Sequence, residues 1–550
     1  MIDFPFPSPS RGGARGGGTR RIIVRIASIV IVLALEATRP HAAAARPPQW
    51  TVVVSEKTGG ADALSEYGTN SQYYLIPHVV EPLVRIELLP NERAWGVVPV
   101  LAEKWSFPDP RTFVVELRRG IKFQNGEELT AEHVKAAYDA FVSPEKPGRR
   151  GVVLKALGKA EIAGKHTIRW SLPKPDLSVV AAASHLLVPP MARHTMTREQ
   201  FEARPIGTGP YRATAWPVDG TVQLEAWDGY RGGKPFPEKL SFRHVPEPST
   251  RVFELIAGTA QIATAIPIES LAMVQGNPKL EVVSLTGGSA LSYVINLFKA
   301  TPPLRDRRVR QAMNYAIDRA AIVRTILGGR GAAMPAPLWP GWLGASDENR
   351  PYPYDPDKAR ALLKEAGHPN GFGFRWTVTQ GVFVKDVEVA QAVASQLAKV
   401  GIKATVQPAE RARILAERNE GEYDVTELIW TMYWHPAILL HFTLNASFPD
   451  AKLTPKWGPL PPELARARRL MSDAAEATSL EATQRAYAAL NQLMHEEAFW
   501  LFVHTVDSLW GVQKDIAWRP YPAAFPTSDD YWHRTGRKAP ESPTVPSVPK

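Results

Sequence analysis

The chain has 550 residues, of which 44% are hydrophobic and 22% are charged, and this composition is typical of a globular protein with about three domains. The formal net charge is +10, but residues 46–550 hold 59 basic and 53 acidic residues, and this charge of +6 is too mild and too evenly spread to predict nucleic-acid binding. Cysteine is absent, which excludes disulfides, thiolate metal ligands, a thiol nucleophile and a cysteine-linked lipid anchor.

Residues 19–48, "TRRIIVRIASIVIVLALEATRPHAAAARPP", have the order of an export signal. Three arginines precede an apolar run over 26–35, and small residues follow up to Ala45. The apolar run is shorter than the roughly 20 residues that span a bilayer, which disfavours the alternative of an uncleaved anchor. The Arg20-Arg21 pair leaves twin-arginine export open beside the general route. We therefore predict cleavage near Ala45, a periplasmic location, and a leader over 1–45 outside the fold.

Strand and helix patterns alternate after this leader, and they predict a mixed α/β chain. Asn125-Gly126 marks a turn, and Thr130 is a good N-cap for the helix that follows. The spacing predicts one long amphipathic helix over 306–327 and another closed by Gly367. Strands are predicted within 50–56, 112–117, 166–172, 209–216, 221–227, 239–246, 260–266, 292–298, 374–380, 401–409 and 499–504, and further helices within 249–258, 387–400 and 479–497.

Motifs for enzyme chemistry are absent from the sequence. "IGTGPY" (206–211) is rich in glycine but precedes a strand, so it does not predict a phosphate cradle. There is no G-x-S-x-G elbow, and His435 and His441 are better interpreted as independent residues than as metal ligands. We therefore expect neither catalysis nor a cofactor.

The stretch "VPVLAEKWSFPDPRTFVVELRRGIKFQNGEELTAEHVKAAYDAF" (98–141) is the strongest of several motifs that lie in order along residues 50–530. The others are "VVEPLV" (79–84), "PIGTGPYRATAW" (205–216), "LRDRRVRQAMNYAIDRAAI" (304–322) and "YDPDKARALLKEAG" (354–367). This ordered set resembles the family 5 solute-binding proteins of ABC importers, the dipeptide- and oligopeptide-binding receptors of the periplasm. We expect these motifs to be mostly scaffold, with Gly209 and Pro210 shaping a turn and Asp318 making a helix–loop contact.

The resemblance implies a two-lobed periplasmic binding protein fold of α/β class with an extra domain. Domain I would be discontinuous and domains II and III continuous, while residues 538–550 would form a disordered tail. The segments are 46–78, 205–287 and 499–537 for domain I, 79–204 for domain II and 288–498 for domain III. The strand pattern at 499–504 independently suggests that the first domain is completed late in the sequence. A ligand would bind in the cleft between the lobes.

The stretch "ELIWTMYWHP" (427–436) concentrates rings that suit ligand contact. Its candidate residues are Glu427, Trp430, Tyr433, Trp434 and His435, and the alternative is that the rings pack between domains. In oligopeptide-binding relatives, a Trp matching Trp430 lines the cleft, and an Asp at the position of Tyr433 pairs with the peptide's α-ammonium. Since a buried ammonium without a carboxylate is costly, binding of a peptide by its N-terminus is disfavoured.

Two arginines bind peptide carboxylates in the relatives, and the matching positions here are Arg418 and Glu427. Glu427 could anchor a cation or pair with a nearby arginine. Thr264 and His504, on predicted strands of domain I, complete the candidate ligand-binding set.

The predicted protein is a monomeric receptor without nucleic acid that delivers a solute to an ABC permease and its ATPase subunits. Peptides, opine-like compounds, oligosaccharides and other amphipathic solutes all remain open as ligands. A periplasmic sensor or chaperone on the same scaffold is the first alternative. A secreted hydrolase is the second, although no nucleophile–base pair supports it.

Overall fold

The computed structural model describes most of the chain after residue 48. The predicted leader, the predicted tail and residues 432–460 lie outside the described part, which comprises 49–55, 57–58, 75–88, 95–143, 149–217, 219–297, 302–339, 344–346, 348–380, 384–431, 461–477, 479–517 and 532–533. Within these ranges, no helix has both the length and the apolar composition needed to cross a bilayer.

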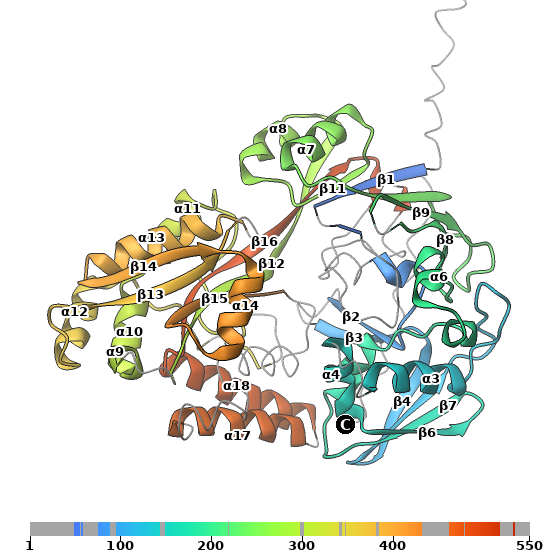
Figure 1. The fold of residues 1–550 in the computed structure, drawn as a ribbon, viewed down its shortest axis with the longest axis horizontal. Coiled ribbons are helices and arrows are strands. Elements are labelled where there is room, and N and C mark those ends of the chain that lie inside the picture. The colour runs from blue at the N-terminus through green and yellow to red at the C-terminus, as the bar shows by residue number, and fades with distance from the viewer. Residues whose placement is uncertain are drawn as a thin grey trace, which may run out of the picture. The chain divides into compact units, whose positions relative to one another are not determined.

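A ten-stranded mixed sheet runs through the described chain (Figure 1). Strand β16 lies in its interior, between β12 and β11, and it comes from the end of the chain. The order is β14 (Ile402–Ala409), β13 (Phe372–Thr379), β15 (Val425–Thr431), β12 (Leu280–Ile295), β16 (Trp500–Gln513), β11 (Ile262–Thr264), β1 (Gln49–Val54), β10 (Lys239–His244), β9 (Thr221–Ala226) and β8 (Tyr211–Ala215). The mixture of strand directions and interleaved helices confirms the predicted α/β class.

Smaller sheets and the helices complete the secondary structure. The other strands are β2 (Val84–Leu88) with β3 (Trp95–Pro99), β17 (Ile516–Ala517) with β18 (Trp532–His533), and the sheet β4 (Ala102–Asp109), β5 (Thr112–Leu117), β7 (Thr167–Ser171) and β6 (Lys159–Gly164). The α-helices are α3 (Ala131–Val142), α4 (Arg149–Leu154), α5 (Val179–Ala182), α6 (Arg198–Ala203), α7 (Pro248–Ala257), α8 (Leu271–Gln275), α9 (Pro302–Arg305), α10 (Arg307–Tyr315), α11 (Arg319–Thr325), α12 (Pro356–Glu365), α13 (Asp386–Ala398), α14 (Arg411–Glu420), α17 (Pro462–Glu476) and α18 (Leu480–Glu496). The short 3-10 helices are η1 (Ile76–His78), η2 (Lys155–Leu157), η3 (Ala183–His185), η4 (Met191–His194) and η5 (Ile268–Ser270).

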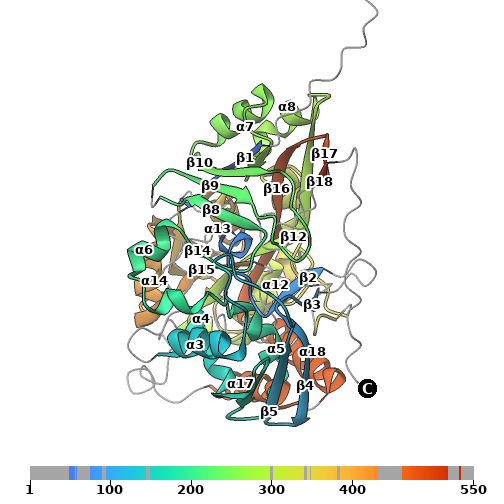
Figure 2. The same ribbon diagram turned by 90° about the vertical axis from the view of Figure 1, so that its right-hand side faces the viewer.

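The first core joins one end of the large sheet to the four-stranded sheet. Strands β8, β9 and β10 lie side by side at that end, and β1 pairs in parallel with β10 (Figure 2). Alternate residues of β5, Phe113, Val115 and Leu117, are buried against α3, as their period-2 pattern predicts. The helix begins where expected, because Thr130 precedes it in an extended conformation.

Two glycines of "PIGTGPYRATAW" allow this segment to lie against the chain at 78–80. A Cβ added to Gly207 would come within 1.9 Å of the Val79 carbonyl oxygen, and one added to Gly209 within 2.5 Å of the His78 oxygen. The Gly209 amide donates a hydrogen bond to the Val79 carbonyl. Only glycine fits such a close backbone approach without a shift, so these residues serve the scaffold.

A buried carboxylate reinforces the same junction. Glu81, with a side chain only 7% exposed, accepts hydrogen bonds from both terminal nitrogens of Arg231, at 2.5 and 2.8 Å. The hydroxyls of Thr208 and Tyr230 also donate to Glu81, at 2.9 and 3.2 Å. The carboxylate therefore ties residues 79–84 to two later segments of the chain, and it supports a scaffold role for this motif.

The second core surrounds the other end of the large sheet. Strand β13 pairs in parallel with both β14 and β15, while α13 connects β13 to β14 and α14 connects β14 to β15. Figure 1 shows α13 above these strands and the antiparallel pair α17 and α18 below them. Gly367 has a φ of +83°, which confirms the predicted glycine closure of α12.

The predicted single helix over 306–327 is wrong, because the structure has two helices, α10 and α11. The break falls at Ala316–Asp318, where the Asp318 side chain accepts a hydrogen bond from the Ala321 amide and caps α11. An aspartate satisfies a free amide at a helix start better than within a helix, so it favours a new N-terminus here. The Asp318 amide also donates to the Gln396 side chain, which confirms the predicted helix–loop contact.

Buried arginines attach these helices to β16. Arg319, 3% exposed, donates to the backbone oxygens of Phe502 and Tyr352. Burial lowers the pKa of its guanidinium to about 9, so it remains charged near neutral pH. Arg310 donates to the backbone and carboxylate of Glu497. The basic residues in "LRDRRVRQAMNYAIDRAAI" thus satisfy backbone carbonyls of the core.

Strands β12 and β16 connect the two cores. Residues 290–295 and 500–503 lie in the second core, whereas Trp510 and Val512 lie in the first. Between them the register shifts: Leu285 pairs with Ser508, and Ser289 pairs with Val506. Three residues of β12 therefore oppose one residue of β16, a β-bulge that bends the pair locally. The domain limits at 287 and 499 stay predictions, since β16 serves both cores.

Candidate functional site

The carboxyl ends of β13, β14 and β15 lie at one edge of the sheet, because the three strands are parallel. Ligands of open α/β sheets bind outside such carboxyl ends, where the strand order reverses. This edge meets that description, since the chain runs from β13 outward to β14 and then returns past β13 to β15. Thr379 ends β13 and Thr431 ends β15, and both mark the candidate edge.

The predicted aromatic site begins at this edge. The backbone of Trp430, the penultimate residue of β15, pairs with Ala290 of β12. Tyr433, Trp434 and His435 lie outside the described residues, and so does the side chain of Trp430. The structure therefore places the start of the ring-rich segment at the carboxyl edge of these strands, and ligand contact by the four rings stays a prediction.

Glu427 lies on β15 inside the second core, with only 4% of its surface exposed. Its carboxyl group lies 2.7 Å from the Thr379 hydroxyl through Oε1 and accepts a hydrogen bond from the Thr379 amide at 3.2 Å through Oε2. Burial raises the pKa of this carboxyl to about 7, because the charged form loses its hydration. Among the described residues, its hydrogen bonds are made with Thr379 rather than with an arginine.

Asp386 is a second acid at this place, and the sequence analysis missed it. It begins α13, is 3% exposed, and lies 3.0 Å from the Thr379 hydroxyl through Oδ2. Its negative charge is a further cause of the raised Glu427 pKa. The available signal was an acid at the first position of a helix that follows the strand carrying Thr379.

Arg418 lies elsewhere. It is half-buried in the last turn of α14, where its charge acts on the buried Tyr423 just before β15. At about 3.3 Å per residue, the six steps from Val425 to Thr431 separate that end of the strand from the candidate edge by roughly 20 Å. The structure does not bring Arg418 to the edge that carries Trp430.

Thr264 and His504 occupy two separate places along the crossing strands. Thr264 ends β11, is 3% exposed, and accepts a hydrogen bond from the Ser55 amide at 3.2 Å. His504 is fully buried in β16 and donates through Nδ1 to the Thr505 carbonyl at 2.9 Å. Burial lowers its pKa to about 4, so the ring is neutral at physiological pH. Contact of either side chain with ligand stays a prediction.

The second core has a further contact beside the crossing strands. Ile268 of η5 packs against the second core and against a smaller core around α7 and α8. Its neighbour Glu269 forms an ion pair with Lys385 at 2.5 Å, and Lys385 directly precedes Asp386. Lys385 has a φ of +57°, a left-handed conformation that is costly for a residue with a side chain. The segment before α13 is therefore held in an unfavourable conformation at a contact with η5.

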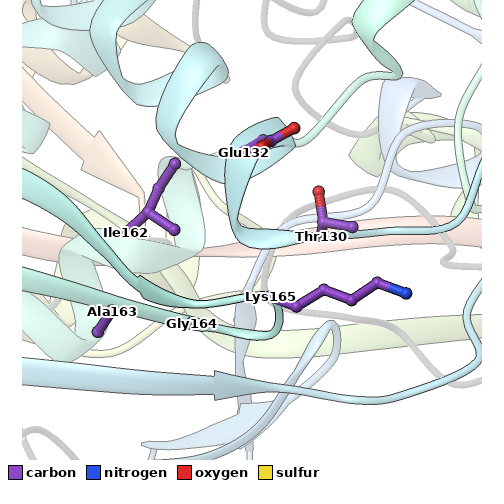
Figure 3. A pocket seen from close by; sticks show the side chains of 6 residues that line it. All are labelled: Thr130, Glu132, Ile162, Ala163, Gly164 and Lys165. Atoms are coloured by element: carbon purple, nitrogen blue, oxygen red, sulfur yellow. The ribbon is translucent and has the colours of Figure 1, made fainter.

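A surface pocket of about 490 Å³ lies in a different region, where the N-terminus of α3 meets the turn between β6 and β7 (Figure 3). Figure 3 shows Thr130 and Glu132 at the helix start, above the segment from Ile162 to Lys165. The Lys165 ammonium forms an ion pair with Glu128 at 2.8 Å. None of the predicted ligand-binding residues lines this pocket.

Comparison with known proteins identifies the family. The profile of the bacterial extracellular solute-binding proteins, family 5 Middle, matches residues 96–447. The chain belongs to this family. The glutathione-binding protein GsiB of Shigella dysenteriae is 30% identical over 430 residues, which cover 73% of this chain and 79% of that protein. GsiB of Salmonella choleraesuis is 33% identical over 325 residues, or 58% of this chain and 62% of that protein.

Solved structures share the fold. A putative peptide-binding protein AppA from Clostridium difficile aligns with a TM-score of 0.76 at 18% identity, over 88% of this chain and all of that one. HbpA2 from Haemophilus parasuis aligns with a TM-score of 0.74 at 21% identity, also over 88% of this chain and 100% of that one. DppA from Helicobacter pylori, in complex with the peptide STSA, aligns with a TM-score of 0.70 at 20% identity, over 87% of this chain and 96% of that one. These structures confirm the predicted two-lobed α/β fold of the family 5 solute-binding proteins.

Proposed function

We propose that this protein captures a small peptide-like solute outside the cytoplasmic membrane and delivers it to an ABC importer. The observation that carries the proposal is the similarity to glutathione-binding proteins over 430 residues, which extends far beyond any single motif. The named relatives are binding proteins, and the sequence offers no nucleophile–base pair, so the proposed role involves no catalysis. The partners would be a membrane permease and its ATPase subunits.

The ligand would bind at the carboxyl edge of β13 and β15, where the ring-rich segment begins. Two features of the fold support solute capture by closure. The long β12–β16 pair, which contains a bulge, joins the two cores, and surface ion pairs such as Lys385–Glu269 and Lys174–Glu476 lie beside it. A bend at such a place would let the lobes close around a solute with little repacking inside either lobe.

The chemistry of the site favours one class of solute. Peptide-binding relatives use an aspartate for the α-ammonium, and Tyr433 replaces it here. A tyrosine offers the amide groups of a peptide one hydrogen bond and a ring face, but it supplies no counter-charge. We therefore propose a short, amide-containing solute whose recognition does not depend on an N-terminal ammonium at this position; glutathione is the first compound to test.

Calorimetry with the purified chain would test this proposal. Glutathione, a dipeptide panel and a neutral oligosaccharide would be titrated into wild type, Trp430→Ala and the control Trp105→Ala, which removes an indole from β4 in the first core. Truncation of a ring at a binding hot spot costs more than about 1 kcal/mol. We expect Trp430→Ala to weaken binding about tenfold, which corresponds to about 1.4 kcal/mol, and Trp105→Ala to leave it unchanged. If only the oligosaccharide bound, the peptide-like class would be wrong.

A further inference from the structure

The hydroxyl of Thr379 bridges two acids inside the second core. Its oxygen lies 2.7 Å from Glu427 Oε1 and 3.0 Å from Asp386 Oδ2. All three residues are at most 4% exposed, so bulk water does not screen the two carboxyl groups from each other. They come from three different elements, β13, β15 and the first position of α13.

Counting hydrogens shows that these contacts need a proton. A threonine hydroxyl carries one hydrogen and can therefore donate to one of the two carboxyl oxygens only. At hydrogen-bond distance, the other oxygen must either donate a hydrogen to Oγ1 or face it lone pair against lone pair. One carboxyl group in its acid form satisfies both contacts, whereas two carboxylates cannot.

Three charged or titratable groups of the described chain lie around the pair. The Tyr293 phenol of β12 is fully buried near both acids, and its oxygen has no hydrogen-bond partner among the described residues. Arg411, at the start of α14, favours the Glu427 carboxylate but is exposed. Lys385, beside Asp386, directs its ammonium to Glu269 and Glu388. Burial, together with the negative charge of Asp386, raises the Glu427 pKa to about 7.

We propose that Glu427 and Asp386 share one proton through Thr379, and that this proton keeps the start of α13 in place at the ligand-binding edge. Losing the proton would leave two like charges in a poorly hydrated site, where their repulsion is strong. Asp386 is the first residue of α13, so the repulsion is relieved most easily by moving the N-terminus of this helix outward. Lys385 moves with it and separates from Glu269.

The protonation of this pair, and therefore the pH, would affect both the candidate ligand-binding edge and the ion pair between Lys385 and Glu269. Its effect on solute capture rests on the proposed function, whereas the site itself can be tested on ligand-free protein. The structure favours Glu427 as the group that holds the proton, since Asp386 also accepts a hydrogen bond from the Val387 amide, which stabilises its carboxylate.

Infrared titration of the ligand-free protein would detect the proton directly. We expect a protonated carboxyl band that disappears with a midpoint near pH 7 and is absent from Glu427→Gln. In Asp386→Asn the midpoint should fall by about one pH unit, because the neighbouring negative charge is gone. Glu410→Gln is the matched control, since Glu410 precedes α14, is exposed, and should leave the band unchanged. Absence of such a band between pH 5 and 7 in wild type overturns the proposal.

Hydrogen exchange would test the structural consequence. After correction for intrinsic rates, amides of residues 386–390 should exchange about tenfold faster at pH 8 than at pH 6 in wild type, and equally at both pH values in Glu427→Gln. Equal exchange in wild type would show that the proton does not hold the helix start. The glutamine variant imitates the protonated acid, so we expect it to fold; if it does not, Asp386→Asn supplies the same comparison.

Glutathione titrations at pH 6 and pH 8 would then connect the proton site to solute capture. We expect the wild-type Kd to increase about threefold or more at pH 8, and that of Glu427→Gln to remain constant. Failure of glutathione to bind at either pH would count against the proposed ligand and leave the infrared result standing. Binding without pH dependence, in a protein that shows the titrating band, would exclude the coupling to solute capture.

Discussion

Replacing Glu81 with glutamine should lower the free energy of unfolding of the lobe that contains the first core by about 2–3 kcal/mol. The carboxylate accepts hydrogen bonds from Arg231, Thr208 and Tyr230 at a place where its side chain is 7% exposed. Breaking a buried ion pair costs about 3–5 kcal/mol when the remaining charge stays dry. The Arg231 side chain is 30% exposed and recovers some hydration, so we place the expected loss below that range.

Urea unfolding of wild type, Glu81→Gln, Arg231→Gln and the double variant would measure this loss and the coupling between the two residues. Glu116→Gln is a suitable control, because Glu116 pairs with Lys104 on the surface of the same lobe, with side chains 46% and 61% exposed. We expect the control to change stability by less than about 0.5 kcal/mol. A loss of that small size for Glu81→Gln would refute the reasoning, since the carboxylate would then not hold residues 79–84 against the later segments.

Substitutions at three further positions test other parts of the structure. Gly207→Ala should lower the melting temperature of the ligand-free protein markedly, because its Cβ would overlap the Val79 carbonyl; an unchanged melting temperature would contradict the close approach. Asp318→Ala should lower the free energy of urea unfolding by about 1 kcal/mol, because α11 loses the capping hydrogen bond from the Ala321 amide. Asp318→Asn keeps an acceptor at this position and should lose much less of that free energy. Tyr433→Asp should increase dipeptide affinity in calorimetry, since a carboxylate can pair with an ammonium; equal or weaker binding would count against the assignment of this position.

Local patterns were sufficient to predict much of the fold. The alternation in β5 and the cap at Thr130 depend on neighbours in sequence, and the structure contains both. The break between α10 and α11 was missed because the apolar period continues through Ala316–Asp318, whereas the cap made by Asp318 is a single hydrogen bond. Periodicity therefore identified the helical region but not its division.

The candidate site was harder to predict from the sequence. Glu427 stood out beside the ring-rich segment, yet its contact with Thr379 joins residues 48 positions apart on two strands. Asp386 contacts the same hydroxyl from a helix, and no local sequence pattern predicts that residues from three separate elements come together. Arg418 was grouped with Glu427 because the two positions match arginines that bind peptide carboxylates in the relatives, but α14 ends near the opposite end of β15.

The position of β16 has a consequence for the order of folding. This strand is the link between the β12 side and the β11 side of the large sheet, yet it is made of residues 500–513. During synthesis, β1, β10 and β11 can associate early, and β12 can pair with β15, but the sheet stays in two separate pieces with open edges until β16 has emerged. Contacts over such long sequence separations form slowly, and unpaired edges invite aggregation in the meantime. A chain stopped before residue 500 should therefore retain helices and local strand pairs yet aggregate, and the late strand makes assembly of both lobes depend on nearly the whole chain.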